Sequence, residues 1–548
     1  MKKKTISRAI SLCLTAVMGL GALTGCQSSA SSTAGSGSAT GTQDGDRPKI
    51  TMFMSDSGTA LPEGWDVSDN KYVNFIEDYA GVDLEIIQPP YADYQTQYNL
   101  MMSSGNLPDI IHTYVLDDLI KYGDQGAFLD LKEYYDNSEV VKNLVSEEAM
   151  ELSRSESGKY YRIPQVADKG YMQGYENWVR YDWLEEYNGG TFPTDVQGYV
   201  DFLYWVKENY PDSVPLACRY QSDRIFMYGE VFFKWFGAMP QSYNIIDGEV
   251  KSTFVLPEYR AAVELYRQLY ADGILDKEFS TLSSSDYNNK VNAGQVAMGT
   301  TTPRGIQASY NVIAANNDTG AFFAFTPSLE TYPEEVRDPI YTKGYSQTPI
   351  GIHGLSISST CKNPDLAWKV IEAFASPELQ ELVEWGEEGV HYEVVDGEKV
   401  PIPEAMSSQE YMYGTPFMLL QGFSAVYGAQ NKNHEMIIGE DRWPMQIEGN
   451  EHCAADAAER GYALMDVQRY VSGLERNPEI ITQREGEANQ FIAEATVNAI
   501  TGQISMEEFD QRVETYKSSY GELAEAWTQV LQENKDFLIE MGCKDAAF

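Results

Sequence analysis

The chain has 548 residues, of which 43% are hydrophobic, 12% aromatic and 22% charged. This length and composition allow several buried cores, which excludes a single small domain and extended disorder as the main state. Its 40 Lys and Arg residues face 82 Asp and Glu residues, for a formal net charge of -42. That charge has the wrong sign for a phosphate backbone or a broad anionic membrane surface, so we expect neither as a partner.

The N-terminus has the features of an export signal. A cationic start that ends at Arg8 precedes an apolar stretch, residues 9–23, that is too short to span a bilayer comfortably. It ends in Leu23-Thr24-Gly25-Cys26, which resembles the lipobox of bacterial lipoproteins. The resemblance implies cleavage before Cys26 and acylation (palmitate) of its thiol, and two or more acyl chains anchor a protein stably. The alternative is ordinary secretion with an incidental cysteine.

Residues 27–46 are almost entirely Ser, Thr, Gly, Ala, Gln and Asp. Such a segment cannot build a core, and we predict a flexible linker with a reach of about 25 Å, from about 5–6 Å times the square root of its length. No later apolar run approaches the roughly 18 residues of a membrane helix. The acylated Cys26 is therefore the only membrane anchor that we predict.

The folded part begins with a strand-helix-strand pattern. Residues 49–54 alternate as a strand, residues 71–80 carry an apolar helical face, Gly81 is a natural helix stop, and residues 82–87 read as a second strand. Such units make parallel strands, and ligands bind beyond the carboxyl ends of those strands. The loops after strands are therefore the places to look for a site.

Later helices have clear start signals. Asn363-Pro364 and Ser376-Pro377 each place a capping side chain before a proline, and residues 505–508 (SMEE) form a capping box. The helix that follows the box carries an aromatic and apolar stripe, for which core packing is expected and a sugar platform is the alternative: Phe509, Val513, Tyr516, Tyr520, Leu523 and Trp527.

Eight short segments follow one another in the order found in extracellular solute-binding proteins of bacterial ABC importers, particularly the LplA/LipO-type lipoproteins of Gram-positive bacteria, which this chain resembles. They are residues 100–111 (LMMSSGNLPDII), 123–131 (GDQGAFLDL), 158–164 (GKYYRIP), 179–184 (VRYDWL), 269–276 (LYADGILD), 294–298 (GQVAM), 386–392 (GEEGVHY) and 500–502 (ITG).

The resemblance implies an α/β, two-lobed periplasmic-binding-protein-like (class II) fold, with a hinge and an α-helical C-terminal part. We expect these divisions: 1–25 signal peptide, 26–46 lipidated Cys and linker, 47–165 first lobe, 166–348 mainly second lobe, 349–430 return to the first lobe and hinge, and 431–548 helical C-terminal part.

The resemblance also implies function. Members capture small solutes, mostly oligosaccharides, and deliver them to ABC permease transmembrane subunits. We expect a monomer on the extracellular face of the cytoplasmic membrane, and no cofactor. The 37 Tyr and 9 Trp residues supply flat faces for sugar rings, although most aromatic residues are expected in cores. The identity of the ligand stays open.

Eight residues are predicted to bind the ligand, of which we expect at least three to face the cleft: Asp56, Trp65, Tyr171, Tyr175, Trp178, Trp235, Arg304 and Tyr345. Asp56 and Trp65 lie in the long loop after the first strand. The three residues from 171 to 178 crowd the first crossing between lobes. The last three belong to the second lobe, where Arg304 follows a strand predicted over residues 296–299.

Several other polar residues are assigned structural roles. Asp109 is expected to satisfy backbone donors, and Arg180 and Asp182 to hold the fold. His112 and Tyr114 are placed where a cleft loop would begin, but no ligand contact is carried over to them.

An enzyme is the second hypothesis, in the form of a secreted carbohydrate-active hydrolase with two carboxylates about 5 to 10 Å apart. The chain has no GxSxG, HExxH or P-loop motif, and no GxGxxG follows a strand. We therefore assign no catalytic residue. A third possibility, an adhesin, lacks the repeats that such proteins often show.

Metal and disulfide chemistry receive no assigned residues. The five histidines are never three to five residues apart, and no DxDxDG loop is present, so no metal ligand is assigned, while a cage of distant oxygens stays open. Cys218, Cys361, Cys453 and Cys543 show no CxxC spacing. One or two disulfides and buried free thiols both stay open.

Overall fold

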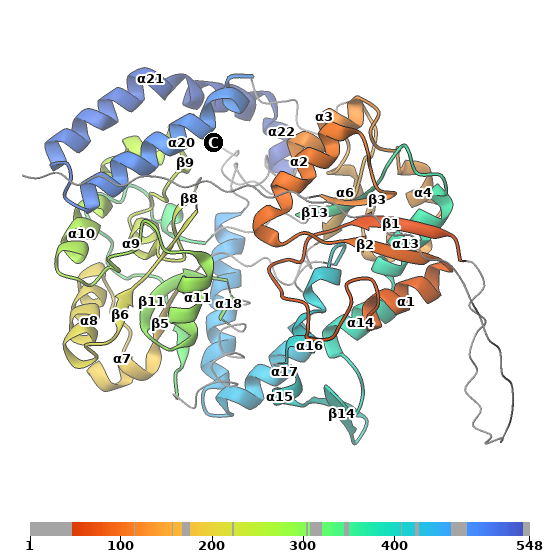
Figure 1. Cartoon of the computed structure of the whole chain (residues 1–548). Helices are drawn as coiled ribbons and strands as arrows, with labels where there is room; N and C mark the ends of the chain where they lie inside the picture. Colours follow the sequence, from red (N-terminus) through yellow and green to blue (C-terminus); the bar gives the residue numbers. More distant parts are fainter. Residues whose placement is uncertain are drawn as a thin grey trace, which may run out of the picture. The chain divides into compact units, whose positions relative to one another are not determined.

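A computed structural model describes residues 47–540 apart from 114–115, 156, 167–175, 222–223, 303–304, 307–319, 345–349, 407, 422–426 and 462–478. The chain divides into Met1–Asp46 and Arg47–Phe548. Cys26, the signal peptide and the linker lie outside the described residues, as do Tyr114 and Cys543. In the second unit the elements gather around two separate main sheets, a mixed α/β architecture of the predicted class (Figure 1).

The first sheet opens with the predicted strand-helix-strand unit. Strand β1 (Lys49–Phe53) pairs in parallel with β2 (Asp83–Ile87), and helix α1 (Lys71–Ala80) lies between them in the chain. The Asn70 side chain accepts hydrogen bonds from two amides of the first helical turn. Gly81 ends α1 with φ +70°, a left-handed conformation that glycine adopts without a Cβ penalty. The predicted unit is thus confirmed.

The first sheet has the strand order β2-β1-β3-β13-β4. Its other strands are β3 (Ile110–Thr113), β13 (Ile350–Ile357) and β4 (Ile163–Val166). Strands β1, β2 and β3 are parallel, whereas β13 runs antiparallel to β3 and β4. The carboxyl ends of the three parallel strands therefore meet at one edge, which is where α/β sheets place ligand sites.

The helices of this first lobe come from two stretches of the chain, residues 94–151 and 364–438. They are α2 (Tyr94–Ser104), α3 (Leu116–Asp124), α4 (Lys132–Asp136), α5 (Glu139–Leu144), α6 (Glu147–Glu151), α13 (Pro364–Ala375), α14 (Pro377–Trp385), α15 (Pro403–Met406), α16 (Gln409–Met412) and α17 (Tyr427–Ile438), with 3-10 turns η1 (Tyr91–Asp93) and η5 (Thr415–Phe417) and a hairpin of β14 (Tyr392–Val395) and β15 (Glu398–Pro401).

The second sheet has the order β12-β5-β11-β6. Its strands are β5 (Glu176–Arg180), β6 (Val214–Leu216), β11 (Val296–Thr301) and β12 (Phe323–Phe325). Strand β5 is antiparallel to both β11 and β12, and β6 is parallel to β11. Strand β11 runs two residues beyond the strand predicted there.

Helices and two hairpins cover this second lobe. They are α7 (Tyr181–Asn188), α8 (Val196–Asn209), α9 (Val231–Trp235), α10 (Pro257–Ala271), α11 (Ser284–Asn292), α18 (Trp443–Arg460), α20 (Glu479–Ile500), α21 (Met506–Glu533) and α22 (Lys535–Glu540), with η3 (Thr253–Val255), η4 (Pro339–Thr342), β7 (Arg219–Gln221), β8 (Arg224–Met227), β9 (Tyr243–Ile246) and β10 (Glu249–Ser252).

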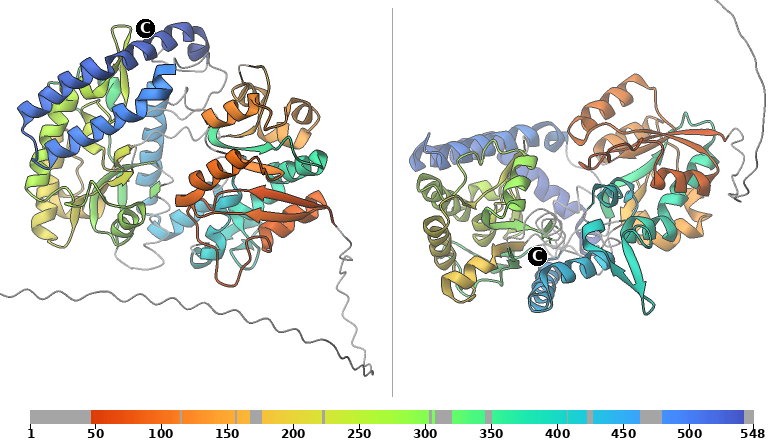
Figure 2. Two further views of the ribbon diagram at one scale, coloured as in Figure 1. Left: turned by 45° about the horizontal axis from the view of Figure 1, so that its top comes forward. Right: turned by 60° about the horizontal axis from the view of Figure 1, so that its bottom comes forward.

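The predicted capping box opens α21. The Ser505 side chain accepts from the Glu508 amide at 3.1 Å, and the Glu508 carboxylate accepts from the Ser505 amide at 2.8 Å. Helices α20 and α21 run side by side (Figure 2). Tyr516 of the stripe packs 5.2 Å from Phe254, and Trp527 is buried. The stripe is therefore core packing.

The two proline-marked helix starts differ in their caps. Ser376 accepts from the Leu379 amide at the start of α14, as predicted. Asn363 precedes α13, but its side chain makes no capping hydrogen bond, so that part of the prediction is wrong. Pro364 alone marks this start, because its fixed φ suits the first helical turn and it has no N–H to satisfy.

The charges predicted to hold the fold do so. Asp109 Oδ2 accepts from the amide and the hydroxyl of Thr51, both at 2.9 Å, which ties β1 to the start of β3. Arg180 pairs with Asp182 and donates to the Gly294 carbonyl, while Asp182 Oδ1 accepts from the Phe322 amide. These carboxylates satisfy backbone donors.

Among the described residues, no helix combines the length and the apolar character that crossing a membrane requires.

Candidate ligand-binding site

A cavity of about 280 Å³ lies against the second sheet. Trp178 of β5, Thr301 of β11 and Phe323 of β12 line it from the sheet, and Tyr287 of α11 lines it from the side. Met412 belongs to α16, which is attached to the first lobe through Tyr411, whose carbonyl accepts from Tyr72 of α1. The described lining thus includes a residue from each lobe.

The indole of Trp178 is held by close packing. Its side chain is 3% exposed and meets Phe323 edge to face, with ring centroids 4.9 Å apart. It lies over Gly299 of β11 so closely that a Cβ at residue 299 would be 2.7 Å from Trp178 Cζ2. A side chain at residue 299 would displace the ring, so glycine at this position leaves room for the indole that lines the cavity.

Tyr228 reaches the cavity from a strained turn after β8. It has φ +67°, and Phe226 two residues earlier has φ +61°, a conformation that is rare for bulky residues and costs about 1–3 kcal/mol each. The turn is held by the Thr300 amide, which donates to the Tyr228 carbonyl at 2.8 Å, and by the Tyr266 hydroxyl, which donates to the Gly229 carbonyl at 2.6 Å.

This strain places two tyrosine rings together. Tyr228 stacks on Tyr287 with centroids 5.5 Å apart and an interplanar angle of 26°. The guanidinium of Arg219 lies 4.8 Å from the Tyr228 ring centroid on a hairpin behind it. With Trp178, these rings give the cavity flat apolar faces.

Neutral polar groups complete the described lining. Asn288, Asn292 and Thr301 supply amide and hydroxyl groups. Burial raises the pKa of Tyr287 well above its ordinary value, so its hydroxyl keeps its proton. Burial also raises the pKa of nearby Glu230 to about 8, so this carboxyl is mostly protonated at pH 7. Among the described lining residues none carries a formal charge. The aromatic rings and the amide and hydroxyl groups suit a ligand with flat apolar faces and hydroxyl edges.

A histidine pair lies at the edge of the first sheet where the parallel strands end. His112 Nε2 is 2.9 Å from Nδ1 of His353, and His112 Nδ1 accepts from the Ser55 amide at 3.3 Å. Because Nδ1 is an acceptor, Nε2 carries the proton and donates to His353. Burial lowers the pKa of His112 well below its ordinary value, so the ring is neutral. His112 thus lies inside β3, not in a loop after it as predicted.

The eight predicted ligand residues fall into three groups. Trp178 lines the cavity. Tyr171, Tyr175, Arg304 and Tyr345 lie outside the described residues.

Asp56, Trp65 and Trp235 are not brought together with Trp178. Asp56 Oδ1 accepts from the Gly58 amide at 2.8 Å, an Asx turn after β1. Trp65 packs edge to face on Tyr413, with centroids 5.9 Å apart, in the first lobe. Trp235 is 2% exposed and lies 4.4 Å from the Tyr199 ring in the core of the second lobe. For each of the eight residues, contact with a ligand stays a prediction.

Sequence reasoning missed Tyr228, Tyr287, Phe323 and Met412. One signal was available, because Tyr287, Asn288, Val291 and Asn292 recur at helical spacing and place aromatic and amide groups on one face of α11. No sequence signal marked the turn at Tyr228, because this residue has a left-handed φ although it is not a glycine.

The other candidate chemistry groups are structural in the described part of the chain. His391 is buried and its Nδ1 accepts from the Glu387 amide at 3.1 Å. No cluster of three or more His, Cys, Asp or Glu residues suited to a metal ion occurs among the described residues. Cys218, Cys361 and Cys453 are free thiols.

Comparisons with known proteins agree with this architecture. The chain is 24% identical over 486 residues to lipoprotein LipO of Bacillus subtilis, which covers 84% of this chain and 88% of LipO. It is 25% identical over 368 residues to the fructooligosaccharide ABC transporter substrate-binding protein FusA of Streptococcus pneumoniae, covering 62% of this chain and 64% of FusA.

Solved structures share the fold. FusA in complex with kestose superposes with a TM-score of 0.63 at 18% identity, over 89% of this chain and 100% of that one. A human-milk-oligosaccharide (HMO) binding solute-binding protein of Bifidobacterium longum infantis gives a TM-score of 0.65 at 16% identity, over 88% of this chain and 98% of that one. The predicted two-lobed fold is confirmed. Residues 72–387 match the model of bacterial extracellular solute-binding proteins, and the chain belongs to that family.

Proposed function

We propose that this protein captures an extracellular oligosaccharide in the cavity of Trp178, Tyr228 and Tyr287, and delivers it unchanged to an ABC permease. One observation carries the proposal. The strained turn at Tyr228 holds its ring against Tyr287 at the cavity that Trp178 lines. Backbone strain kept at such a place points to function.

The chemistry of the cavity supports a sugar. Pyranose and furanose rings have apolar faces that stack on aromatic side chains, while their hydroxyls need donors and acceptors at the ring edge. Trp178 and the two tyrosines supply faces, and Asn288, Asn292 and Thr301 supply edges. Relatives named for fructooligosaccharides and human-milk oligosaccharides support the ligand class, and their variety leaves the particular sugar open.

Capture would use the two lobes. The second lobe holds the sugar on its aromatic faces, and the first lobe, which contributes Met412, closes over it. The closed population rises only by the preference of the sugar for that form over the open one. No bond is made or broken, and no carboxylate pair of the kind that a glycoside hydrolase needs is found among the described lining residues.

The same proposal includes the cellular location of the protein and its attachment to the membrane. Export, cleavage before Cys26, acylation of its thiol and the linker of residues 27–46 would keep a monomeric protein on the extracellular face of the cytoplasmic membrane, near its permease. The lobe divisions at residues 165, 348 and 430 are proposed with it.

A thermal-shift screen tests the proposal. Kestose, a human-milk oligosaccharide mixture, and neutral and uronate oligosaccharides are added to the full chain in detergent. A ligand at 100 times its Kd stabilises the folded state by about 2.7 kcal/mol, so a binder raises Tm in proportion to the logarithm of its concentration. Chromatography of the recovered sugar checks that it is unchanged. No shift with any oligosaccharide, or cleavage products, would contradict the proposal.

A further inference from the structure

Three connections run between described elements of the two lobes, and the second-lobe ends of the first two lie close together. The first leads from β4 to Glu176 at the start of β5, and the second leads from η4, through Lys343 and Gly344, to β13. The third leads from α17, which packs on α14, to the first turn of α18, a helix that packs on β12 and η4.

A buried ion pair joins the first two ends. Lys234 Nζ of α9 donates to Glu176 Oε2 at 2.7 Å and to the Thr342 carbonyl at 2.8 Å. The other carboxylate oxygen, Glu176 Oε1, accepts from the Gly344 amide at 3.0 Å. The two side chains are 6% and 3% exposed. A charge this deeply buried needs its partner, so the pair fixes the start of β5 to the residues that leave η4.

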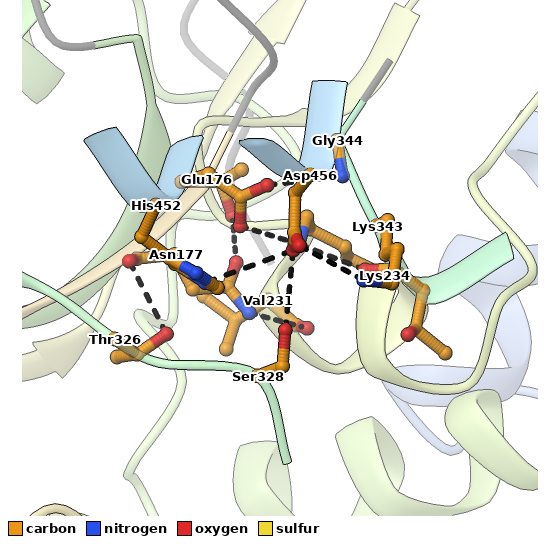
Figure 3. Close-up of polar contacts among 12 residues, drawn as sticks. Glu176, Asn177, Val231, Lys234, Thr326, Ser328, Lys343, Gly344, His452 and Asp456 are labelled. Carbon is orange, nitrogen blue, oxygen red and sulfur yellow. Dashed lines mark hydrogen bonds and ion pairs between the residues drawn. The ribbon is translucent and has the colours of Figure 1, made fainter. Parts of the chain in front are cut away.

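A second group of charges joins the last turns of α18, the helix that the third connection enters, to the second end (Figure 3). Lys343 Nζ is 3.0 Å from Asp456 Oδ1 and 2.7 Å from Glu459 Oε2, both on α18. Asp456 Oδ2 accepts from Ser328 Oγ at 3.2 Å and lies 3.6 Å from Nε2 of His452. Because Lys343 and Gly344 are neighbours, the two groups form one network.

The same network reaches the ligand cavity along β5. Glu176 and Trp178 lie on one face of the strand, since side chains alternate, and Glu176 pairs with Thr301 of β11, which also lines the cavity. Between them, Asn177 accepts from Thr300 Oγ1 at 2.9 Å and donates to the Val231 carbonyl at 3.2 Å. The anchored ends of the connections and the cavity wall are thus parts of one hydrogen-bonded body.

We propose that Glu176, Lys234, Lys343 and Asp456 are positioning residues that hold the second-lobe ends of the first two connections, together with helix α18, which the third connection enters, as one rigid anchor on the cavity wall. The anchor restricts the relative orientations that the lobes can adopt. Residues at this place would therefore control closure without touching the sugar. The inference concerns the protein without ligand, so it can fail while the proposed capture of a sugar stands.

The test measures the distance between the lobes directly. Spin labels are placed at Glu378→Cys in α14 and Glu208→Cys in α8, both exposed, with Cys361 and Cys543 changed to Ser. Electron–electron double resonance on the full chain in detergent then gives the distribution of inter-lobe distances. The test variant is Glu176→Gln with Lys234→Met, which removes both charges and keeps the side-chain sizes. The matched control is Asp182→Asn with Arg180→Met, which removes an ion pair of 16% and 4% exposure between the first turn of α7 and the end of β5. This pair touches none of the three connections.

We expect the test variant to broaden the distance distribution at least twofold, and the control to keep the native width. Equal widths in all three proteins, or equal broadening by test and control, would overturn the proposal. If the double variant does not fold, Lys343→Met is measured in its place, because its side chain is 17% exposed and its loss leaves the Glu176 pair intact. Broadening by this variant supports the anchor, and a native width overturns it.

Discussion

Trp178 and Gly299 face each other across two paired strands, β5 and β11, at a separation that leaves no room for a methyl group. The indole is thereby fixed as a wall of the cavity rather than as a mobile ring.

Gly299→Ala should therefore weaken sugar binding about tenfold, because the new Cβ displaces the indole, and a tenfold loss corresponds to about 1.4 kcal/mol. Overpacking of this kind also costs about 1–3 kcal/mol of stability. Calorimetry and urea unfolding measure the two effects. Gly486→Ala in α20 is the control, since a Cβ there meets nothing within 4 Å. Native affinity in Gly299→Ala would show that the position of the indole does not matter.

Two substitutions of Tyr287 distinguish the contribution of ring stacking to sugar binding from that of hydrogen bonding. Tyr287→Phe keeps the ring stacked on Tyr228, whereas Tyr287→Ala removes both the ring and the hydroxyl. We expect Kd to rise a few-fold for Phe and at least tenfold more for Ala, since an aromatic pair contributes about 0.5–1.5 kcal/mol beyond its buried area. Equal effects from both changes, measured by calorimetry, would mean that the ring contributes no stacking.

Glu230 gives a pH dependence with a defined sign. Its folded pKa is raised to about 8 by burial, so the folded protein keeps a proton that the unfolded chain releases above about pH 4.5. Its contribution to stability is present below pH 4.5 and is lost as the pH rises toward 8. From pH 5.5 to 7.5 this loss is about 2 to 3 kcal/mol. Glu230→Gln should remove it, so that the urea midpoint of the variant falls less over this range than that of the parent. Parallel pH curves would contradict the assignment.

His434 should make stability depend on pH in the opposite direction. Burial lowers its folded pKa to about 3, so below pH 6.5 the unfolded chain takes up a proton that the folded protein excludes. Its effect is absent above pH 6.5, and stability is lost as the pH falls from there toward 3. His434→Leu should remove about 1 kcal/mol of the change between pH 7.5 and 5.5. Unfolding by urea at the two pH values measures this, and an unchanged difference would argue against a buried neutral ring.

Mutation should distinguish the structural role of Trp235 from the proposed ligand-binding role of Trp178. Trp235→Ala should cost about 3–5 kcal/mol of stability, because it empties a packed position beside Tyr199. Its effect on sugar affinity should be small when the protein is folded. Calorimetry below the lowered Tm compares the sugar affinity of this variant with that of the parent. A strong loss of affinity in folded Trp235→Ala would show that Trp235 contributes to the ligand site.

Local signals in the sequence predicted local structure well. Gly81, the Ser505 capping box and the start of α14 at Pro377 act within a few residues, so composition and spacing reveal them. The order of the eight family segments predicted the two-lobed fold. Asp109 and Arg180 were assigned correctly because a charged residue near buried strands must find backbone or charged partners.

The candidate site was harder to predict because it depends on tertiary placement. Trp178 and Trp235 look alike in sequence, yet one lines a cavity and the other fills a core. Tyr228 reaches the cavity through a φ that tyrosine seldom adopts, and Phe323 arrives from a strand more than 140 residues beyond Trp178 in the chain. Such positions follow from strand pairing, which periodicity alone does not reveal.

The most direct test of the central claim is calorimetric titration of the full chain with the oligosaccharide that gives the largest thermal shift, repeated on Trp178→Ala with Tyr287→Ala. We predict measurable one-site binding by the parent, at least a hundredfold loss in the double variant, and full recovery of the unchanged sugar. Native affinity in a folded double variant, or conversion of the sugar during the titration, would contradict capture at this cavity.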